Sequence, residues 1–264
     1  MTVSKDAALV HDAAITDQFT RQAVQFAASA IHHDQAALDL LVGSARPRPE
    51  DISLDVACGP GSVVAAFALR VRHAEGLDAT EAMLEEARKL AARGGLHNVT
   101  WQRGSVYALP FADGAFDIVS CRYAFHHLLE PVRALAEMVR VCRDGGRVVL
   151  CDAFASDDPG KAAAFNGMER YRDPSTVEFR TLGFLRGLFA ETGLPQPAEH
   201  FYAVPAELER LLAMAYPVNN DRAGLRAMIE AAVEGDTMGV GARREGCTVR
   251  FDYPAVVLAA VKGG

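Results

Sequence analysis

Residues 52–61, ISLDVACGPG, are the most informative stretch of this chain for its fold class. Their first half is a short, mostly apolar run that predicts a buried strand, and Asp55 lies within it. Gly59, Pro60 and Gly61 follow, and glycine lets a backbone turn sharply and approach a bound molecule closely. A glycine-rich turn after the first strand of an open α/β sheet is a usual place for a ligand. We therefore take this turn as the candidate binding loop.

The rest of the chain alternates short apolar runs with helical patterns. Further strands are expected at 73–77, 99–102, 116–121, 147–151, 199–203, 248–252 and 256–261. Helices are expected within 1–42, at 62–68, from Thr80 onward, and at 132–142, 181–192 and 205–234. This rhythm predicts an α/β fold with a doubly wound, mostly parallel sheet. We divide it into an N-terminal helical lid (1–45), a binding core (46–204), a helical insertion or cap (205–246) and C-terminal strands that complete the sheet (247–264).

Composition narrows the possible functions. Of the 264 residues, 27 are basic and 34 acidic, a net charge of −7, which disfavours a nucleic-acid partner. The five cysteines contain no Cys-x-x-Cys pair, so we expect neither a metal site nor a disulfide framework. No apolar run is long enough to span a membrane, and residues 1–17 lack a signal-peptide pattern. We expect a cytoplasmic protein, either a monomer or a homodimer.

The binding loop does not match the common phosphate-binding loops. A dinucleotide fingerprint needs a third glycine, but counting from Gly59 gives Val64 and counting from Ala57 gives Ser62. No Gly-Lys-Ser/Thr follows either, which excludes a Walker-type loop and disfavours an NAD-dependent oxidoreductase. Asp55 would repel a pyrophosphate, but it suits a ligand that carries an ammonium group.

A second acid supports an adenosine-containing ligand. Asp78 ends the second expected strand, where its carboxylate would accept hydrogen bonds from both hydroxyls of a ribose. S-adenosylmethionine combines an adenosine with an ammonium, a carboxylate and a sulfonium, and it has no phosphate. The two acids around a glycine turn therefore favour this cofactor.

The blocks at 54–61, 76–84, 104–111, 116–119, 125–128 and 145–148 occur in an order typical of one family. With them the chain resembles the class I S-adenosylmethionine-dependent methyltransferases of the ubiquinone/menaquinone-biosynthesis type, over residues 52–152. The resemblance implies a seven-stranded sheet with an antiparallel last strand. It also implies methyl transfer from S-adenosylmethionine, with S-adenosylhomocysteine as the product.

The resemblance assigns cofactor contacts to ten positions. The methionine end would lie against Asp55, Arg122 and the turn that contains Ala57, Gly59 and Gly61; the adenosine would lie against Asp78, Ala79, Met83, Ser105 and Val106. Two positions depart from the family pattern. Ala57 stands where the first glycine is usual, and Ser105 stands where an aspartate commonly accepts the adenine amino group.

The sequence constrains the binding site of the methyl acceptor less closely than that of the cofactor. His126 and His127 follow the fourth strand, near the expected methyl group, and histidine can act as a base at neutral pH. Packing is the alternative role for both. Five further residues are candidates for the substrate pocket: His32 in the lid, Tyr171 and Arg172 after the fifth strand, and Tyr216 and Asn219 in the break of the insertion.

These observations predict an enzyme that methylates oxygen, carbon or nitrogen of a small, apolar metabolite. Such chemistry depends mainly on aligning acceptor and cofactor, so it needs no elaborate catalytic set. The alternative is a non-catalytic or repurposed S-adenosylmethionine-binding protein, with a structural or sensing role or a different reaction such as a cyclisation.

Overall fold

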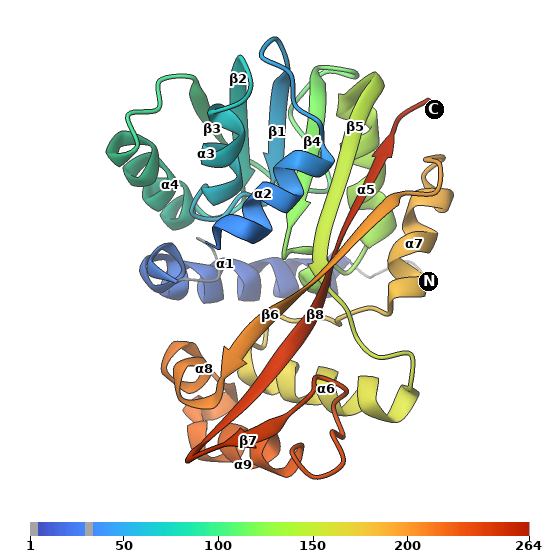
Figure 1. Cartoon of the computed structure of the whole chain (residues 1–264). Coiled ribbons are helices and arrows are strands. Elements are labelled where there is room, and N and C mark those ends of the chain that lie inside the picture. Colours follow the sequence, from blue (N-terminus) through green and yellow to red (C-terminus); the bar gives the residue numbers. More distant parts are fainter. Residues whose placement is uncertain (1–4, 30–33, 264) are drawn as a thin grey trace.

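A single sheet organises the computed structural model, which describes residues 5–29 and 34–263 (Figure 1). Five strands run parallel: β1 (Ile52–Val56), β2 (His73–Asp78), β3 (Val99–Arg103), β4 (Phe116–Arg122) and β5 (Cys142–Ala153). β8 (Thr248–Val261) is antiparallel to β5 and to β6 (Ala198–Glu207), and β7 (Arg243–Glu245) pairs with β8. The sheet order is β3-β2-β1-β4-β5-β8-β6. The predicted mostly parallel α/β fold is confirmed.

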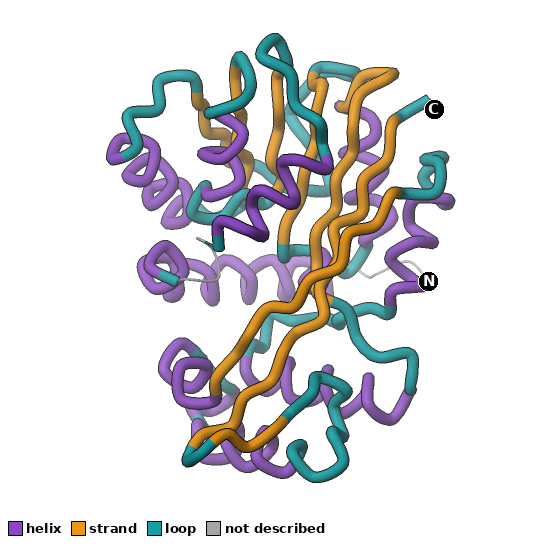
Figure 2. The backbone as a smooth tube through the Cα atoms, in the orientation of Figure 1, coloured by secondary structure: helices purple, strands orange, loops and turns teal. Residues whose placement is uncertain are grey.

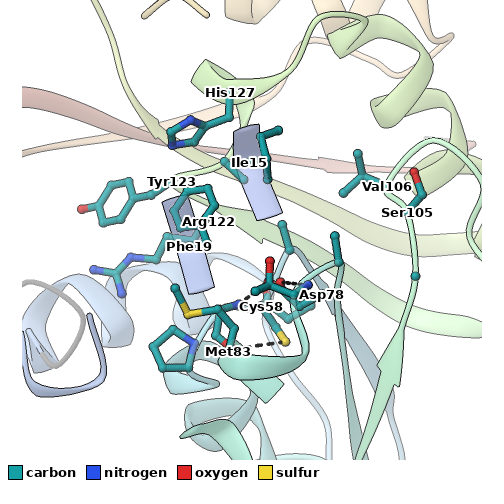
Figure 3. A pocket seen from close by; sticks show the side chains of 18 of the residues that line it. Ile15, Phe19, Cys58, Asp78, Met83, Ser105, Val106, Arg122, Tyr123 and His127 are labelled. Atoms are coloured by element: carbon teal, nitrogen blue, oxygen red, sulfur yellow. Dashed lines mark hydrogen bonds between the residues drawn. The ribbon is translucent and has the colours of Figure 1, made fainter. Parts of the chain in front are cut away.

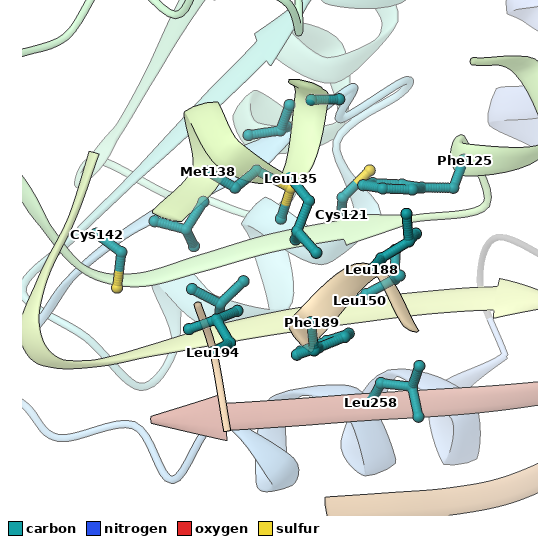
Figure 4. Packing of buried hydrophobic residues seen from close by; sticks show 14 of the residues in the cluster. Cys121, Phe125, Leu135, Met138, Cys142, Leu150, Leu188, Phe189, Leu194 and Leu258 are labelled. Atoms are coloured by element: carbon teal, nitrogen blue, oxygen red, sulfur yellow. The ribbon is translucent and has the colours of Figure 1, made fainter. Parts of the chain in front are cut away.

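Helices cover both faces of this sheet, which divides the core into two layers (Figure 2). On one face lie α2 (Gln35–Ser44), α3 (Ser62–Ala68) and α4 (Glu81–Arg93), and on the other lie α5 (Pro131–Val141) and α7 (Leu182–Glu191). Successive strand residues alternate between the layers, so Val149 packs toward α3 whereas Leu150 packs toward α5 and α7 (Figure 4). The parallel strands therefore have apolar residues on both faces.

Two expectations for the C-terminal part were wrong. The strands expected at 248–252 and 256–261 form one continuous strand, β8, which passes through Pro254. The stretch expected to be helical from Pro205 instead begins with the end of β6, where residues 205–207 pair with 250–252 of β8. In both places a long antiparallel ladder with the neighbouring strand outweighs the local preference of proline to interrupt structure.

β6 and β8 extend beyond the parallel strands and carry a second group of helices (Figure 1). These are α6 (Pro159–Arg172), α8 (Leu208–Met214) and α9 (Arg222–Ala231). They enclose an apolar cluster of their own, in which Phe165, Leu225 and Phe251 are almost completely buried. α6 lies outside the segment that the sequence marks as an insertion, yet it packs against α9.

The N-terminal part contains two separate helices with different surroundings. α1 (Lys5–Ala28) packs against α4 and crosses the ends of the parallel strands (Figure 1). Asp34 caps α2 by accepting hydrogen bonds from the backbone of Ala36 and Ala37, and α2 packs against α3 and β8. Of the two helices described in the expected lid, α1 therefore crosses the ends of the strands, whereas α2 covers one face of the sheet. Within the described ranges, no helix combines the length and apolarity needed to cross a bilayer.

Candidate functional site

A cavity of about 510 Å³ opens at the carboxyl ends of β1, β2 and β4, where the sheet order reverses direction. This is the crevice in which open α/β sheets bind ligands, and its volume is typical of small-molecule sites. The turn after β1 forms one side, and α1 contributes Ile15, Thr16, Phe19 and Phe26 to another (Figure 3). We call it the switch-point cavity.

The turn after β1 adopts the left-handed backbone conformation three times. The φ angles are 55° at Ala57, 51° at Gly59 and 86° at Gly61. A side chain on Gly61 would place its Cβ 2.7 Å from the Trp101 ring and 2.9 Å from the Ala87 methyl group. Gly61 therefore lets the turn pack against the sheet and α4, and unlike Ala57 and Gly59 it does not line the cavity. Ala57 adopts a conformation that disfavours any residue with a Cβ.

Asp78 connects the end of β2 to this turn. Its Oδ2 accepts a hydrogen bond from the Gly59 amide at 2.8 Å, and its Oδ1 accepts one from the Thr80 amide at 2.9 Å. Burial raises the pKa of this carboxyl, and the two backbone hydrogen bonds oppose that shift. Each carboxylate oxygen has two lone pairs, so Asp78 still has acceptor capacity toward the cavity.

Asp55 is the more deeply buried acid, with 2% of its surface exposed. Burial raises its pKa to about 7, while a hydrogen bond from the Ser120 hydroxyl and the charge of Arg122 act in the opposite direction. The Ser120 Oγ lies 2.6 Å from Asp55 Oδ1. Near neutral pH the carboxyl is therefore close to its own pKa, and a cation placed beside it would favour the ionised form.

Arg122 provides a positive charge in the same cavity. It ends β4, is 8% exposed, and its guanidinium lies 4.5 Å from the centre of the Tyr123 ring. Tyr123 has a φ of 55°, and its hydroxyl lies 2.5 Å from the hydroxyl of Tyr202 in β6. Neither tyrosine is among the site residues predicted from the sequence. Tyr123 directly follows a strand end, and that position was the only available signal.

Most residues expected to bind the cofactor line the switch-point cavity. They are Asp55, Ala57, Gly59, Asp78, Ala79, Met83, Ser105, Val106 and Arg122. Several apolar lining residues were not singled out beforehand, including Tyr107 and Leu128. The apolar face expected on the N-terminal helix contributes Phe19 and Phe26, whose rings meet edge to face at 5.8 Å.

The two adjacent histidines have different surroundings. His127 lines the cavity, whereas His126 does not. His126 Nδ1 lies 2.8 Å from Asp152 Oδ1, and its ring stacks on Phe179 at a centroid distance of 4.1 Å. His126 therefore fixes the segment that follows β4, and of the two histidines only His127 faces the cavity.

The residues expected in a substrate pocket do not gather at one place. Tyr216 and Asn219 line a second cavity of about 570 Å³, between α1 and the turn before α9. Tyr171 instead donates a hydrogen bond to Asp221 at 2.6 Å, and Arg172 pairs with the buried Glu169 at 2.7 Å. Neither Tyr171 nor Arg172 lines the switch-point cavity or this second cavity. His32 lies outside the described residues.

No cluster of three or more His, Cys, Asp or Glu side chains suited to a metal ion occurs in the part of the chain that the structure describes. Four of the five cysteines, Cys58, Cys121, Cys142 and Cys151, are buried free thiols, and Cys247, directly before β8, is an exposed one. Burial raises the pKa of each of the four buried thiols, which makes them poor nucleophiles and poor metal ligands.

Known proteins are similar to this chain in sequence and in fold. Residues 54–150 match the family model described as a methyltransferase domain. An uncharacterized methyltransferase of Bacillus subtilis, YcgJ, is 29% identical over 92% of this chain and 97% of its own length. A demethylmenaquinone methyltransferase of Listeria monocytogenes is 30% identical over 53% of this chain and 68% of its own.

The crystal structure of YcgJ superimposes with a TM-score of 0.78 at 28% identity, covering 86% of this chain and 98% of that one. The chain therefore belongs to the methyltransferase-domain family and has the Rossmann-like fold of class I methyltransferases.

Proposed function

We propose that this protein transfers a methyl group from S-adenosylmethionine to a small, apolar acceptor. The observation that carries the proposal is the charge pattern of the switch-point cavity. Buried Asp55 and Asp78 stand beside a glycine turn, and Arg122 lies close enough to Asp55 to affect its pKa. This pattern suits a zwitterionic amino acid joined to a ribose, and it disfavours a pyrophosphate.

Each part of the cofactor has matching groups on the chain. Asp55 would accept hydrogen bonds from the ammonium, and the Arg122 guanidinium would lie near the carboxylate. The remaining acceptor capacity of Asp78 would receive the ribose hydroxyls as charge-assisted hydrogen bonds. Met83 and Val106 would pack against the adenine, and the Ser105 hydroxyl would contact its edge.

Bound S-adenosylmethionine supplies the activated methyl group, and the residues of the chain position it. The turn at 57–61 would fix the amino-acid end, and Asp78 would fix the sugar. α1 would cover the cavity and exclude water with Ile15, Phe19 and Phe26. Holding two reactants in register can contribute on the order of 10⁵ M or more in effective concentration. The chain therefore needs to supply little beyond alignment.

We infer the chemical class of the methyl acceptor from the walls of the switch-point cavity that the bound cofactor would leave uncovered. These are the apolar side of α1 and Leu128, beside the His127 imidazole. They favour a mostly apolar molecule, and the name of the Listeria relative, a demethylmenaquinone methyltransferase, agrees with this class. The reacting atom would be oxygen, carbon or nitrogen. We also propose that α6, α8 and α9 form a cap on the acceptor side.

Calorimetry tests the proposal most simply. We expect the protein to bind S-adenosylmethionine and S-adenosylhomocysteine in a one-to-one ratio and NAD⁺ not at all. Mass spectrometry of the isolated protein should also detect the cofactor, and recovery of the demethylated form would indicate turnover as opposed to a sensing role. Binding of NAD⁺ in place of either compound would refute the proposal.

A further inference from the structure

The His127 side chain is a polar group on a mostly apolar wall of the switch-point cavity. It is 6% exposed and lies across the cavity from Cys58, Asp78 and Met83 (Figure 3). The Phe19 ring meets the imidazole edge to face, at a centroid distance of 5.0 Å. The histidine therefore lies under α1, away from the turn that would hold the amino-acid end of the cofactor.

The hydrogen bonds of His127 determine which ring nitrogen carries the proton. Nδ1 lies 3.0 Å from the carbonyl oxygen of Ser175, which can only accept a hydrogen bond. Nδ1 also lies 3.2 Å from the Ser175 hydroxyl, but that hydroxyl donates its hydrogen to Asp173 at 2.5 Å. Both neighbours therefore act as acceptors, and Nδ1 must be the donor. In the neutral ring, Nε2 then has a lone pair and no hydrogen.

The surroundings keep this ring neutral. Burial lowers the pKa of His127 to about 3, and the neighbouring His126 ring acts in the same direction. The charges of Asp173 and Asp152 and the hydrogen bond to Ser175 oppose the shift without reversing it. His11 of α1 hydrogen-bonds through its Nε2 to the His127 backbone carbonyl oxygen at 2.7 Å, and not to the His127 ring. Nε2 therefore stays a hydrogen-bond acceptor throughout the physiological pH range.

We propose that His127 Nε2 accepts a hydrogen bond from the methyl acceptor and so selects molecules that carry a hydroxyl or N–H group. Among the described residues, none forms a hydrogen bond with Nε2, while Nδ1 is held by Ser175 and, through it, by Asp173. A buried acceptor left unpaired costs free energy, so a substrate lacking a donor binds less well. Ser175 and Asp173 are positioning residues, because they act only through the orientation of the ring.

This inference rests on the proposed function, since it assumes that the cofactor occupies the side of the cavity next to the glycine turn. It defines the acceptor as an apolar body bearing one hydrogen-bond donor. Alkylphenols are suitable probes of this class, and their methyl ethers keep the alkyl-substituted ring but lack the donor. The ether carries one additional methyl group, so the change in the preference for 4-propylphenol over 4-propylanisole between the wild type and the His127 variants measures the hydrogen bond to Nε2.

The test uses the full chain saturated with S-adenosylhomocysteine, with dissociation constants measured by ligand-observed NMR. His127→Asn retains a donor at the Nδ1 position for the Ser175 carbonyl but removes the acceptor at Nε2. His127→Gln places an amide oxygen near the Nε2 position. His97→Gln, at an exposed position outside the cavity, is the matched control.

We expect the wild type and His97→Gln to bind the phenol about three- to tenfold more tightly than the ether, as one neutral hydrogen bond allows. The preference should fall below about twofold in His127→Asn and be partly restored in His127→Gln. Equal affinity in the wild type, failure of both probes to bind, or a preference that persists in His127→Asn would overturn the inference. The affinity for S-adenosylhomocysteine, measured in parallel, should be the same in these variants as in the wild type. If the wild type did not bind S-adenosylhomocysteine, the proposed function itself would be refuted.

Discussion

Replacing Asp55 by asparagine should make the protein more stable and its cofactor binding weaker. Asparagine keeps the shape of the side chain and the hydrogen bond from the Ser120 hydroxyl, which lies 2.6 Å from Asp55 Oδ1. It removes the charge and replaces the other carboxylate oxygen, an acceptor, by an NH₂ group, which donates. The two effects have opposite signs because the buried carboxylate is poorly solvated in the empty cavity yet suited to an ammonium group in the occupied one.

The stability change follows from the raised pKa of Asp55, about 7 against an ordinary value of 3.8. Because the folded state binds the proton more tightly, the stability that this group contributes is present at low pH and is lost as the pH rises toward and through 7. Asparagine cannot ionise and avoids this loss. A shift of this size corresponds to at most about 4 kcal/mol. We therefore expect Asp55→Asn to raise the free energy of unfolding by about 1–4 kcal/mol at pH 8 and to change it little at pH 4.

The binding change follows from the lost ion pair. A hydrogen bond to a charged group contributes about 1.5–3 kcal/mol, so S-adenosylhomocysteine should bind about 10- to 150-fold more weakly to Asp55→Asn. In the wild type the affinity should rise about tenfold from pH 6 to pH 8, as Asp55 ionises, and the variant should lack this dependence. 5′-Methylthioadenosine, which has the adenosine but no ammonium, is the matched control ligand and should bind both proteins equally.

Thermal unfolding and calorimetry at several pH values measure both effects in the same samples. A variant that is less stable than the wild type at pH 8 would refute our account of the buried carboxyl. A variant that binds S-adenosylhomocysteine as tightly as the wild type would refute the placement of the ammonium beside Asp55.

Three further predictions concern the turn, the histidine and the covering helix. Gly61→Ala should lower the free energy of unfolding by at least about 2–3 kcal/mol in denaturant unfolding, because the new Cβ would meet the Trp101 ring. Gly95→Ala, also at positive φ but in open space, should lower it by about 1 kcal/mol. Equal losses in the two variants would contradict the close approach of Gly61 to Trp101. ¹⁵N NMR should find the His127 ring neutral and protonated on Nδ1 at pH 5. Because the pKa of His127 is lowered in the folded state, the stability that this histidine contributes should be lost only as the pH falls from about 6.5 toward 3. An imidazolium at pH 5 would disprove the assignment of a neutral ring. Phe19→Ala should weaken the binding of S-adenosylhomocysteine several-fold, as measured by calorimetry, because the Phe19 ring lines the cavity. Val24→Ala, at a position on the same helix that is 69% exposed, should leave the affinity unchanged. Equal affinities of the two variants would rule out a covering role for α1.

The sequence predicts those parts of the site that depend on short-range spacing. Asp55 and the glycine turn follow one strand, Asp78 ends the next, and parallel strands bring their carboxyl ends to one edge. Phe19 and Phe26 recur at helical spacing, so the apolar face of α1 was also visible. These features can be predicted from the residue periodicities of strands and helices alone.

Other parts depend on contacts between distant segments. Tyr123 meets Tyr202, and His127 meets Ser175, only because β6 and the loop after α6 return to the end of β4. No local pattern indicated which of two adjacent histidines faces the cavity. Pro254 likewise lies within a strand because a long ladder with β6 holds the chain extended, and a single-sequence pattern does not contain that ladder.

A crystal structure of the protein with S-adenosylhomocysteine would show which residues hold the cofactor. The ligand should occupy the switch-point cavity, with its amino group on Asp55, its carboxylate near Arg122 and its ribose hydroxyls on Asp78. Ligand density elsewhere, or an adenosine in this cavity with its ribose away from Asp78, would contradict this placement.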